Sequence, residues 1–458
     1  MTERQKRLLT GPILPMLLSL SGPTVVVLMV QTGVGVAETY FVSNLGTDAL
    51  AGVALVFPAL MLMQMMSNGG IGGGISSAVA RALGAGRKAD ADALAWHSIV
   101  VGVAFGVVFT AAEWFGGRWL FHSMGGSGDV LAASLGYGNV VFAGSILIWL
   151  TSLLAAALRG AGNVMVPALV TLIGAAIIVP LSPALIFGWG PLPRMGVAGA
   201  GTAVVVYYSV ATTMLILYLR SRNSPLRLGG GAIQWRLLRD ILKVGGLSAL
   251  STVQMNLTVA IVTGMVGRFG ADAVAGYGIA SRLDYLLIPL VFGIGTGALT
   301  MVGTNVGAGN FVRARRIAWT AGLFGAGITE LIGIAAASEP HAWLGLFSDE
   351  PAVLATGTLY FRTVAPFYGL VGLGMLLYFA GQGAGRVFWP VMAGLARLVI
   401  AGVGGWLIVA QMGLGLPTLF VAVAFASIAY GGGTAVAALL GPWRPAPVAV
   451  AKAERISA

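Results

Sequence analysis

Long runs of apolar residues alternate with short polar segments along almost the whole chain. Most runs reach the length of about 20 residues that an α-helix needs to cross the hydrocarbon core of a bilayer. Because a bilayer offers backbone groups no partners, such runs predict transmembrane helices, and the predicted fold is an all-α polytopic membrane protein. Twelve spans are expected, at residues 13–42, 50–80, 93–115, 130–158, 164–188, 196–219, 240–267, 273–305, 317–337, 352–381, 388–410 and 415–440.

The composition supports this interpretation and excludes a soluble globular protein. Of the 458 residues, 57% are hydrophobic and 9% are charged, whereas roughly a quarter of the residues are charged in ordinary soluble domains. The 69 glycines also fit, because small residues allow membrane helices to approach closely. The chain contains no cysteine, which rules out disulfides, thiol nucleophiles and thiolate metal sites.

The net charge of +11 comes largely from short basic segments between the apolar runs. Basic residues precede the first span, follow every second span and fill the longest loop, while the alternate loops hold few of them. Since Lys and Arg are enriched in cytoplasmic loops, this pattern predicts a multi-pass protein of the plasma (inner) membrane with both termini in the cytoplasm. The charge therefore indicates topology and gives no reason to expect nucleic acid as a partner. We interpret residues 1–10 as the lead into the first span, not as a cleaved signal peptide.

Three glycine-rich motifs recur in the second half of the chain at a nearly constant separation. Matches that keep one register over most of each half indicate an internal repeat. The paired segments are 46–52 with 270–276, 84–86 with 307–309, and 160–162 with 383–385.

The repeat predicts two six-helix bundles joined by a linker. Each half holds an even number of spans, so both begin on the same side of the membrane and form parallel repeats, not inverted ones. We expect the halves to enclose a central cavity and to rock against each other for alternating access. The predicted boundaries are 1–220 for the N-terminal bundle, 221–239 for the cytoplasmic linker and 240–458 for the C-terminal bundle.

This ordered set of motifs resembles the multidrug and toxic compound extrusion (MATE) family over nearly the whole chain. The most specific stretch is 31–52, and residues 159–163 (RGAGN) and 382–386 (QGAGR) are similar to the family's fourth- and tenth-helix endings. The resemblance implies a V-shaped pair of bundles around a central cavity. It also implies export of small amphipathic, often cationic molecules in exchange for protons or sodium.

Several positions depart from the family pattern. Glu38 occupies the position where the family usually has an aspartate, while Ile178 and Ser182 replace an asparagine and an aspartate often found on the fifth helix. The seventh-helix acid of one branch corresponds to Asn256, and its tenth-helix acid has no counterpart near Val371. Because a sodium site needs several converging oxygen ligands, the proton is the expected coupling ion and sodium the alternative. No cofactor and no metal site are predicted.

Acidic residues inside apolar spans are functional candidates, because burying an ionisable group in a membrane is costly. Glu38, toward the outer end of the first span, is the predicted coupling group, since a carboxyl buried in a weakly polar cavity can exchange a proton near neutral pH. Asp284 and Glu330 are candidates for cation or substrate contact, and structural ion pairs with other helices are the alternative. Glu113 is expected to be solvated near a membrane boundary. Arg397 is expected to be a structural partner for a carboxylate or a helix end.

Neutral polar and aromatic residues supply further candidates for cation or substrate contact. Amide side chains in the second and seventh spans could line the cavity, although hydrogen bonding between helices explains them equally well. Two tyrosines could make cation–π contacts, with anchoring at the membrane interface as the alternative. These candidates are Gln31, Gln64, Asn68, Gln254, Asn256, Tyr277 and Tyr285.

Two other functions compete with export. An intramembrane enzyme would need a nucleophile with a base or a metal cluster, but the three histidines are widely separated and no Gly-x-Ser-x-Gly motif is evident. We therefore expect no enzymatic activity and no catalytic residues. A flippase for a lipid-linked precursor would need a strongly cationic cavity to hold phosphates, whereas most arginines fall in the predicted loops. The expected partners are small amphipathic or cationic substrates and membrane lipids, and the expected state is a monomer.

Overall fold

The computed structural model describes residues 3–441, and every regular element in this part of the chain is a helix. Eleven helices are long and apolar enough to cross a membrane, and the pair α6 and α7, bent by 49°, forms a twelfth span. The predicted all-α architecture with twelve spans is therefore confirmed. Two short helices, α1 (Glu3–Thr10) and α13 (Pro340–Leu344), lie outside the spans.

The first six spans are built from α2 to α9. Spans two and four are each interrupted, the former by a π-helical segment and the latter by the bend at Gly144. The elements are α2 (Ile13–Ser43), α3 (Thr47–Met65), η1 (Met66–Ile71), α4 (Gly72–Gly84), α5 (Lys88–Ser123), α6 (Gly128–Ala143), α7 (Ser145–Gly160), α8 (Met165–Phe187) and α9 (Val197–Arg220).

The last six spans follow after a loop. Helix α10 begins at Trp235, so the end of the predicted 221–239 linker is already helical. The elements are α10 (Trp235–Val266), η2 (Gly267–Phe269), α11 (Ala271–Gly307), α12 (Phe311–Ser338), α14 (Pro351–Val364), η3 (Ala365–Phe367), α15 (Tyr368–Gly383), α16 (Phe388–Leu398), η4 (Val399–Gly404), η5 (Leu407–Gln411) and α17 (Leu416–Leu440).

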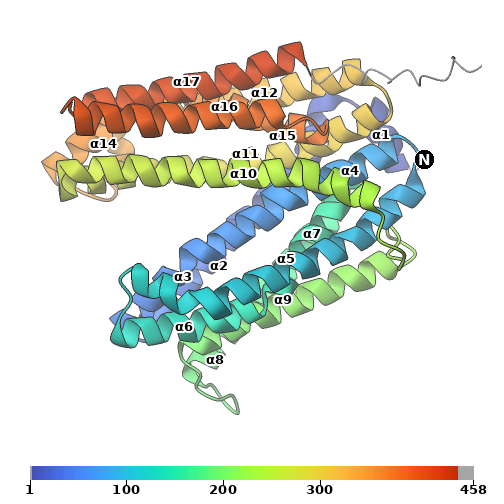
Figure 1. Ribbon diagram of the computed structural model, residues 1–458, viewed down its shortest axis with the longest axis horizontal. Helices are drawn as coiled ribbons and strands as arrows, with labels where there is room; N and C mark the ends of the chain where they lie inside the picture. The colour runs from blue at the N-terminus through green and yellow to red at the C-terminus, as the bar shows by residue number, and fades with distance from the viewer. Residues whose placement is uncertain (1–2, 442–458) are drawn as a thin grey trace, which may run out of the picture.

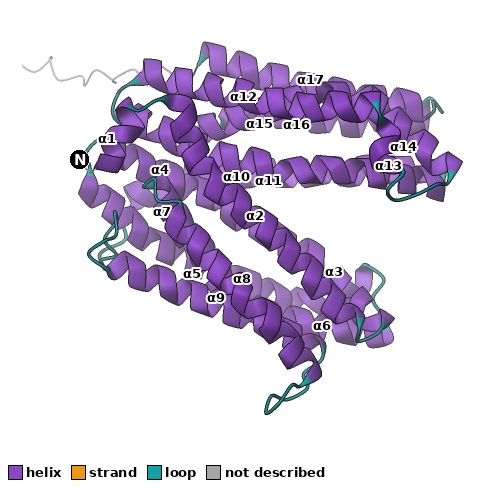
Figure 2. Ribbon diagram, turned by 180° about the vertical axis from the view of Figure 1, so that it is seen from behind, coloured by secondary structure: helices purple, strands orange, loops and turns teal. Residues whose placement is uncertain are grey.

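The helices form a V whose two arms separate at one end and converge at the other (Figure 1). Helices α2, α3 and α5 to α9 make one arm, and α10 to α17 make the other. Seen from behind, α2 runs from the convergent end along the inner side of its arm (Figure 2). The arms contact each other where α11 meets α2 and α4 and where α10 meets η1 and α4.

Glycines of the recurring motifs allow this convergence. A Cβ at Gly84 would collide with the Thr304 carbonyl of α11, and a Cβ at Gly307 would collide with the Arg81 carbonyl of α4. The two glycines lie 223 positions apart, as do Arg81 and Thr304. The repeat therefore appears in the structure as a reciprocal close packing of α4 on α11.

Polar contacts tie the two arms together at the same end. Arg81 donates to both carboxylate oxygens of Asp240 at 2.8 Å. Gln382 of α15 donates across the arms to the Gly69 carbonyl at 2.9 Å, and within its own arm to the Ser248 hydroxyl at 2.8 Å. Charge-assisted hydrogen bonds are among the stronger polar contacts, so the convergent end is closed by specific bonds as well as by packing.

Candidate functional site

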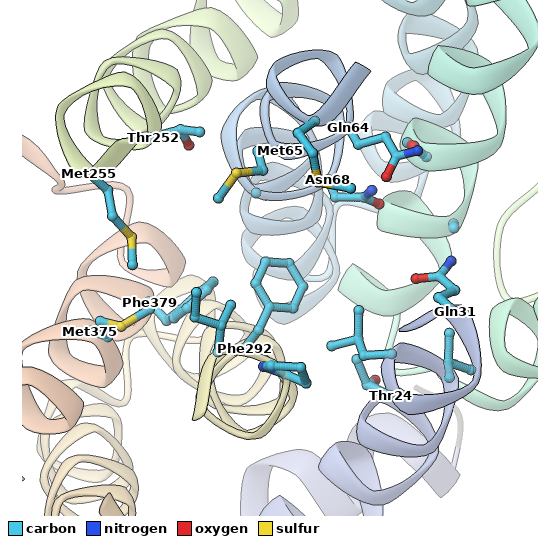
Figure 3. Close-up of a pocket in the computed structure, with 18 of the residues that line it drawn as sticks. Thr24, Gln31, Gln64, Met65, Asn68, Thr252, Met255, Phe292, Met375 and Phe379 are labelled. Atoms are coloured by element: carbon cyan, nitrogen blue, oxygen red, sulfur yellow. The ribbon is translucent and has the colours of Figure 1, made fainter. Parts of the chain in front are cut away.

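A cavity of about 300 Å³ lies between the arms, next to the region where they converge. Its walls come from α2, α3, η1, α7, α8 and α9 on one side and from α10, α11, α15, α16 and α17 on the other. Figure 3 shows labelled side chains from both sides directed into it. A largely apolar concave space with a few converging polar groups is typical of a small-molecule site.

Methionine and aromatic side chains make up much of the apolar lining. Phe292 of α11 and Phe379 of α15 meet edge to face, with ring centroids 5.3 Å apart. Methionine is flexible and polarizable, so it adapts to differently shaped partners. The lining methionines are Met61, Met65, Met255 and Met375.

Four of the seven neutral candidates lie in the cavity wall, namely Gln31, Gln64, Asn68 and Gln254. The Oε1 atom of Gln254 is buried and has no hydrogen-bond partner. Asn256 is outside the lining; it donates to the Thr252 carbonyl of its own helix at 2.9 Å and to the sulfur of Met65, a lining residue on α3, at 3.4 Å. Four of the amides named from the sequence thus lie in the wall, while Asn256 contacts the wall from behind through Met65.

The charged groups of the cavity were not recognised in the sequence. Among the described residues that line it, the ionisable side chains other than tyrosine are Arg159 at the end of α7 and Arg397 on α16, and neither Asp nor Glu occurs. The guanidinium of Arg397 lies over the Tyr430 ring, 5.6 Å from its centroid. In the sequence, Arg159 resembled a loop residue and Arg397 a structural partner, so neither predicted a positively charged wall.

Glu38 lies on α2 outside the cavity lining, seven residues toward the open end of the V from Gln31. It is half-buried in its own arm, with Ser182 of α8 and Tyr137 of α6 as neighbours. The Oε1 atom of Glu38 and the Oγ atom of Ser182 are both buried and form no well-aligned hydrogen bond among residues 3–441, although Ser182 is close enough to Glu38 to interact with it. No described cation lies beside the carboxyl group, so its site is weakly polar.

Asp284 occupies a different environment in the other arm. Its Oδ2 accepts a hydrogen bond from the Tyr360 hydroxyl at 2.6 Å, and it is close enough to Arg397 for the two charges to interact. Tyr277 packs edge to face on Tyr360, with centroids 5.3 Å apart, whereas Tyr285 is 52% exposed. Asp284, Tyr277 and Tyr285 all lie outside the cavity lining.

Glu330, a third acid inside a span, has a local structural contact. Glu330 of α12 accepts a hydrogen bond at 2.7 Å from the backbone N–H of Gly369, in the first turn of α15. A carboxylate is favourable at a helix N-terminus because it complements the helix dipole. Glu330 lies outside the cavity lining as well.

The expectation that Glu113 is solvated is wrong. Its residue is only 6% exposed, and its carboxyl packs against Gly117 and Gly138, with Oε1 lacking a hydrogen-bond partner. The predicted span ended at 115, but α5 continues to Ser123. Glu113 therefore lies well inside the helix and not at its boundary.

Comparison with known proteins gives the same family for both halves. The MatE family model matches residues 23–184 and 248–407, which together exceed half of the chain. The chain is 27% identical to an FAD transporter of Shewanella oneidensis over 405 residues, covering 86% of this chain and 87% of the relative. It is 25% identical over 362 residues to a probable multidrug resistance protein NorM of Thermotoga maritima, covering 78% of this chain and 77% of the relative.

A solved structure also matches closely. It is described as the outward-facing conformation of a multidrug resistance MATE family transporter of the MOP superfamily. The alignment has a TM-score of 0.85 at 25% identity and covers 96% of this chain and 98% of the other.

Proposed function

Because the chain belongs to the MATE family of multi-pass membrane exporters, we propose that it is a proton-coupled antiporter in which Glu38 binds the coupling proton. The observation that carries this proposal is the Glu38 site, where a carboxyl oxygen is buried between helices with no hydrogen-bond partner. Such a site disfavours the charged form of the carboxyl group, so the difference in free energy between its charged and its protonated form is small. A charge change at an interface between helices can shift the balance between two packed states.

The residues around Glu38 favour a proton over sodium. The neighbours of Glu38 are a hydroxyl, that of Ser182, and the phenol of Tyr137. A sodium ion needs more oxygen ligands, whereas one carboxyl group is sufficient for a proton.

Charge placement supports an orientation for the cycle. The basic segments before α2, after α4 and between α9 and α10 gather at the convergent end of the V (Figure 1). Under the positive-inside rule this end is cytoplasmic, with both termini on the same side, and the V opens outward. Glu38, nearer the open end, then takes up a proton from outside as cargo leaves. It releases the proton inside after the arms have rocked.

The cargo we propose is a small amphipathic molecule. The apolar, methionine-rich wall supports this class, as do the multidrug relatives. The relative named as an FAD transporter indicates that the fold also serves a cargo with phosphates and aromatic rings. The cationic cargo expected from the sequence finds no carboxylate in the cavity lining.

The test is gradient-driven transport in vesicles containing the purified protein. Proton and sodium gradients are imposed separately, and uptake of an anionic and a cationic fluorescent dye is followed for wild type and Glu38→Gln. We expect transport driven by the proton gradient alone and lost in the variant. Glu339→Gln, which changes an exposed acid, is the matched control. Sodium-driven transport, or a proton response that survives Glu38→Gln, would refute the proposal.

A further inference from the structure

We propose that the central cavity selects an anionic cargo with a planar aromatic part, held by Arg159 and Arg397. This deepens the proposed export function by naming a cargo class, and it rests on the cavity being the transport site. Both arginines line one cavity whose lining, within the described part of the chain, contains no acidic side chain.

Arg159 has no charged partner in the described part of the chain. Its backbone carbonyl accepts a hydrogen bond from the Thr300 hydroxyl at 2.9 Å, which fixes the end of α7 against α11. Its side chain makes neither an ion pair nor a hydrogen bond with a described residue, and it is largely buried beside a cavity whose lining also includes Ala155, Val164 and Pro167. An unpaired guanidinium in such surroundings is costly, and an anion within reach would offset that cost.

Arg397 is only partly compensated. Its guanidinium lies on the face of Tyr430, which leaves its planar donor fork free on the sides away from the ring. Asp284 interacts with it through space but forms no ion pair within 4 Å, and one Asp284 oxygen already accepts from Tyr360. Arginine presents donors in a geometry that matches carboxylate, sulfonate or phosphate oxygens.

The remaining lining defines the rest of the cargo. Phe292, Phe379, Tyr207 and Tyr378 present aromatic surfaces to the cavity. Aromatic rings stack favourably on planar ligands, and methionine sulfur also contacts aromatic rings well. An anion attached to a planar ring system would therefore use both components of the wall, whereas a lipophilic cation would face two arginines.

Equilibrium binding without any gradient tests this proposal directly. The full-length protein in lipid nanodiscs is titrated with carboxyfluorescein and with tetramethylrhodamine methyl ester, which share a xanthene ring system but carry opposite charge. Because no gradient is used, the result does not depend on whether Glu38 couples to protons. A failure of proton-driven transport and a failure of charge selection are thus separate results.

Wild type is expected to bind the anionic dye about tenfold more tightly or better, since charge-assisted hydrogen bonds contribute at this level. Arg397→Met should weaken anionic binding by about tenfold and strengthen cationic binding, and Arg397→Lys should restore part of the anionic preference. Arg159→Met should act in the same direction if it folds. Arg282→Met, which removes an exposed arginine that lies against Phe347 outside the cavity, should leave both affinities unchanged.

Tighter binding of the cationic dye by wild type would overturn the proposal. An anionic preference that Arg397→Met leaves at its wild-type value would also overturn it, because the selection would then come from elsewhere. Arg397 lies at the cavity surface and forms no ion pair with a described residue, so Arg397→Met should fold. It therefore tests the proposal even if Arg159→Met fails to fold.

Discussion

Glu38 and Asp284 are both acids inside membrane-spanning helices, one in each arm, yet their surroundings differ. Each has one carboxyl oxygen that is buried without a hydrogen-bond partner. The second oxygen of Asp284 accepts from Tyr360, and Arg397 lies near it. Glu38 has Ser182 and Tyr137 as neighbours and no cation beside it.

The contrast shows that an acid in a span is not by itself a coupling group. A hydrogen bond from the Tyr360 phenol and a nearby guanidinium favour the charged form of Asp284 and oppose the effect of its burial. A carboxyl with little to hold its charge is easily switched between charged and neutral forms. On this basis we propose that Glu38 in the first arm is the coupling group, and we expect Asp284 in the second arm to change its charge less readily.

The largest expected effect separates these two roles in transport. Glu38→Gln should reduce proton-driven transport by about tenfold or more, the scale of a typical coupling free energy between sites. Asp284→Asn should retain most of it, because its amide can still accept from Tyr360. Initial rates under one imposed proton gradient measure both. Equal losses in the two variants would show that the arms share the coupling.

The next prediction concerns stability, where a change at the Asp284 site should have a larger effect than a change at the Glu38 site. Tyr360→Phe removes the hydrogen bond to Asp284 and should lower the free energy of unfolding by about 1.5–3 kcal/mol, as for hydrogen bonds to charged groups. Ser182→Ala, beside Glu38, should cost less, because the contact of the Ser182 hydroxyl with Glu38 is weaker than the 2.6 Å bond of Tyr360 to Asp284. Thermal unfolding in one detergent compares the two. A larger loss for Ser182→Ala than for Tyr360→Phe would mean that a strong hydrogen bond from Ser182 stabilises Glu38, which contradicts the weakly polar site described above.

The architecture could be predicted from the sequence because span length and loop charge are local properties. The amides Gln31, Gln64 and Asn68 were found for the same reason, since polar residues are conspicuous in apolar runs. The glycine pair Gly84 and Gly307 was visible as a motif, although only the structure shows that each packs on the other's helix.

The charge of the cavity could not be predicted, because it depends on which way two helices face. Arg159 ends α7, which is set at 49° to α6 by a bend at Gly144. Arg397 lies two residues before the start of the π-helical η4, where the helical period changes. Neither the bend nor the π-helix was predicted, so the two arginines were assigned to topology and to structural pairing.

Glu113 tests whether lack of a partner is sufficient for coupling. Like Glu38 it lies in the first arm with an unpartnered buried oxygen, but it packs between α5 and α6 against two glycines and is 6% exposed. Coupling also requires exchange with water, so Glu113→Gln should leave the initial rate of proton-driven transport unchanged. If that rate falls as far as in Glu38→Gln, protons pass through both acids and access is wider than the static packing indicates.

The smallest effect is expected at Glu330, the acid whose partner is a backbone N–H. Glu330→Gln keeps an acceptor for Gly369 but removes the charge at the start of α15, so stability should fall by only about 0.3–1 kcal/mol, the usual value of such a helix-dipole contact. Glu330→Ala removes the acceptor too and should cost more. Thermal unfolding of both variants, with transport measured in parallel, distinguishes a structural acid from a coupling one. If Glu330→Gln loses transport at unchanged stability, Glu330 is a second coupling acid and the arm made by α10 to α17 also takes part in coupling.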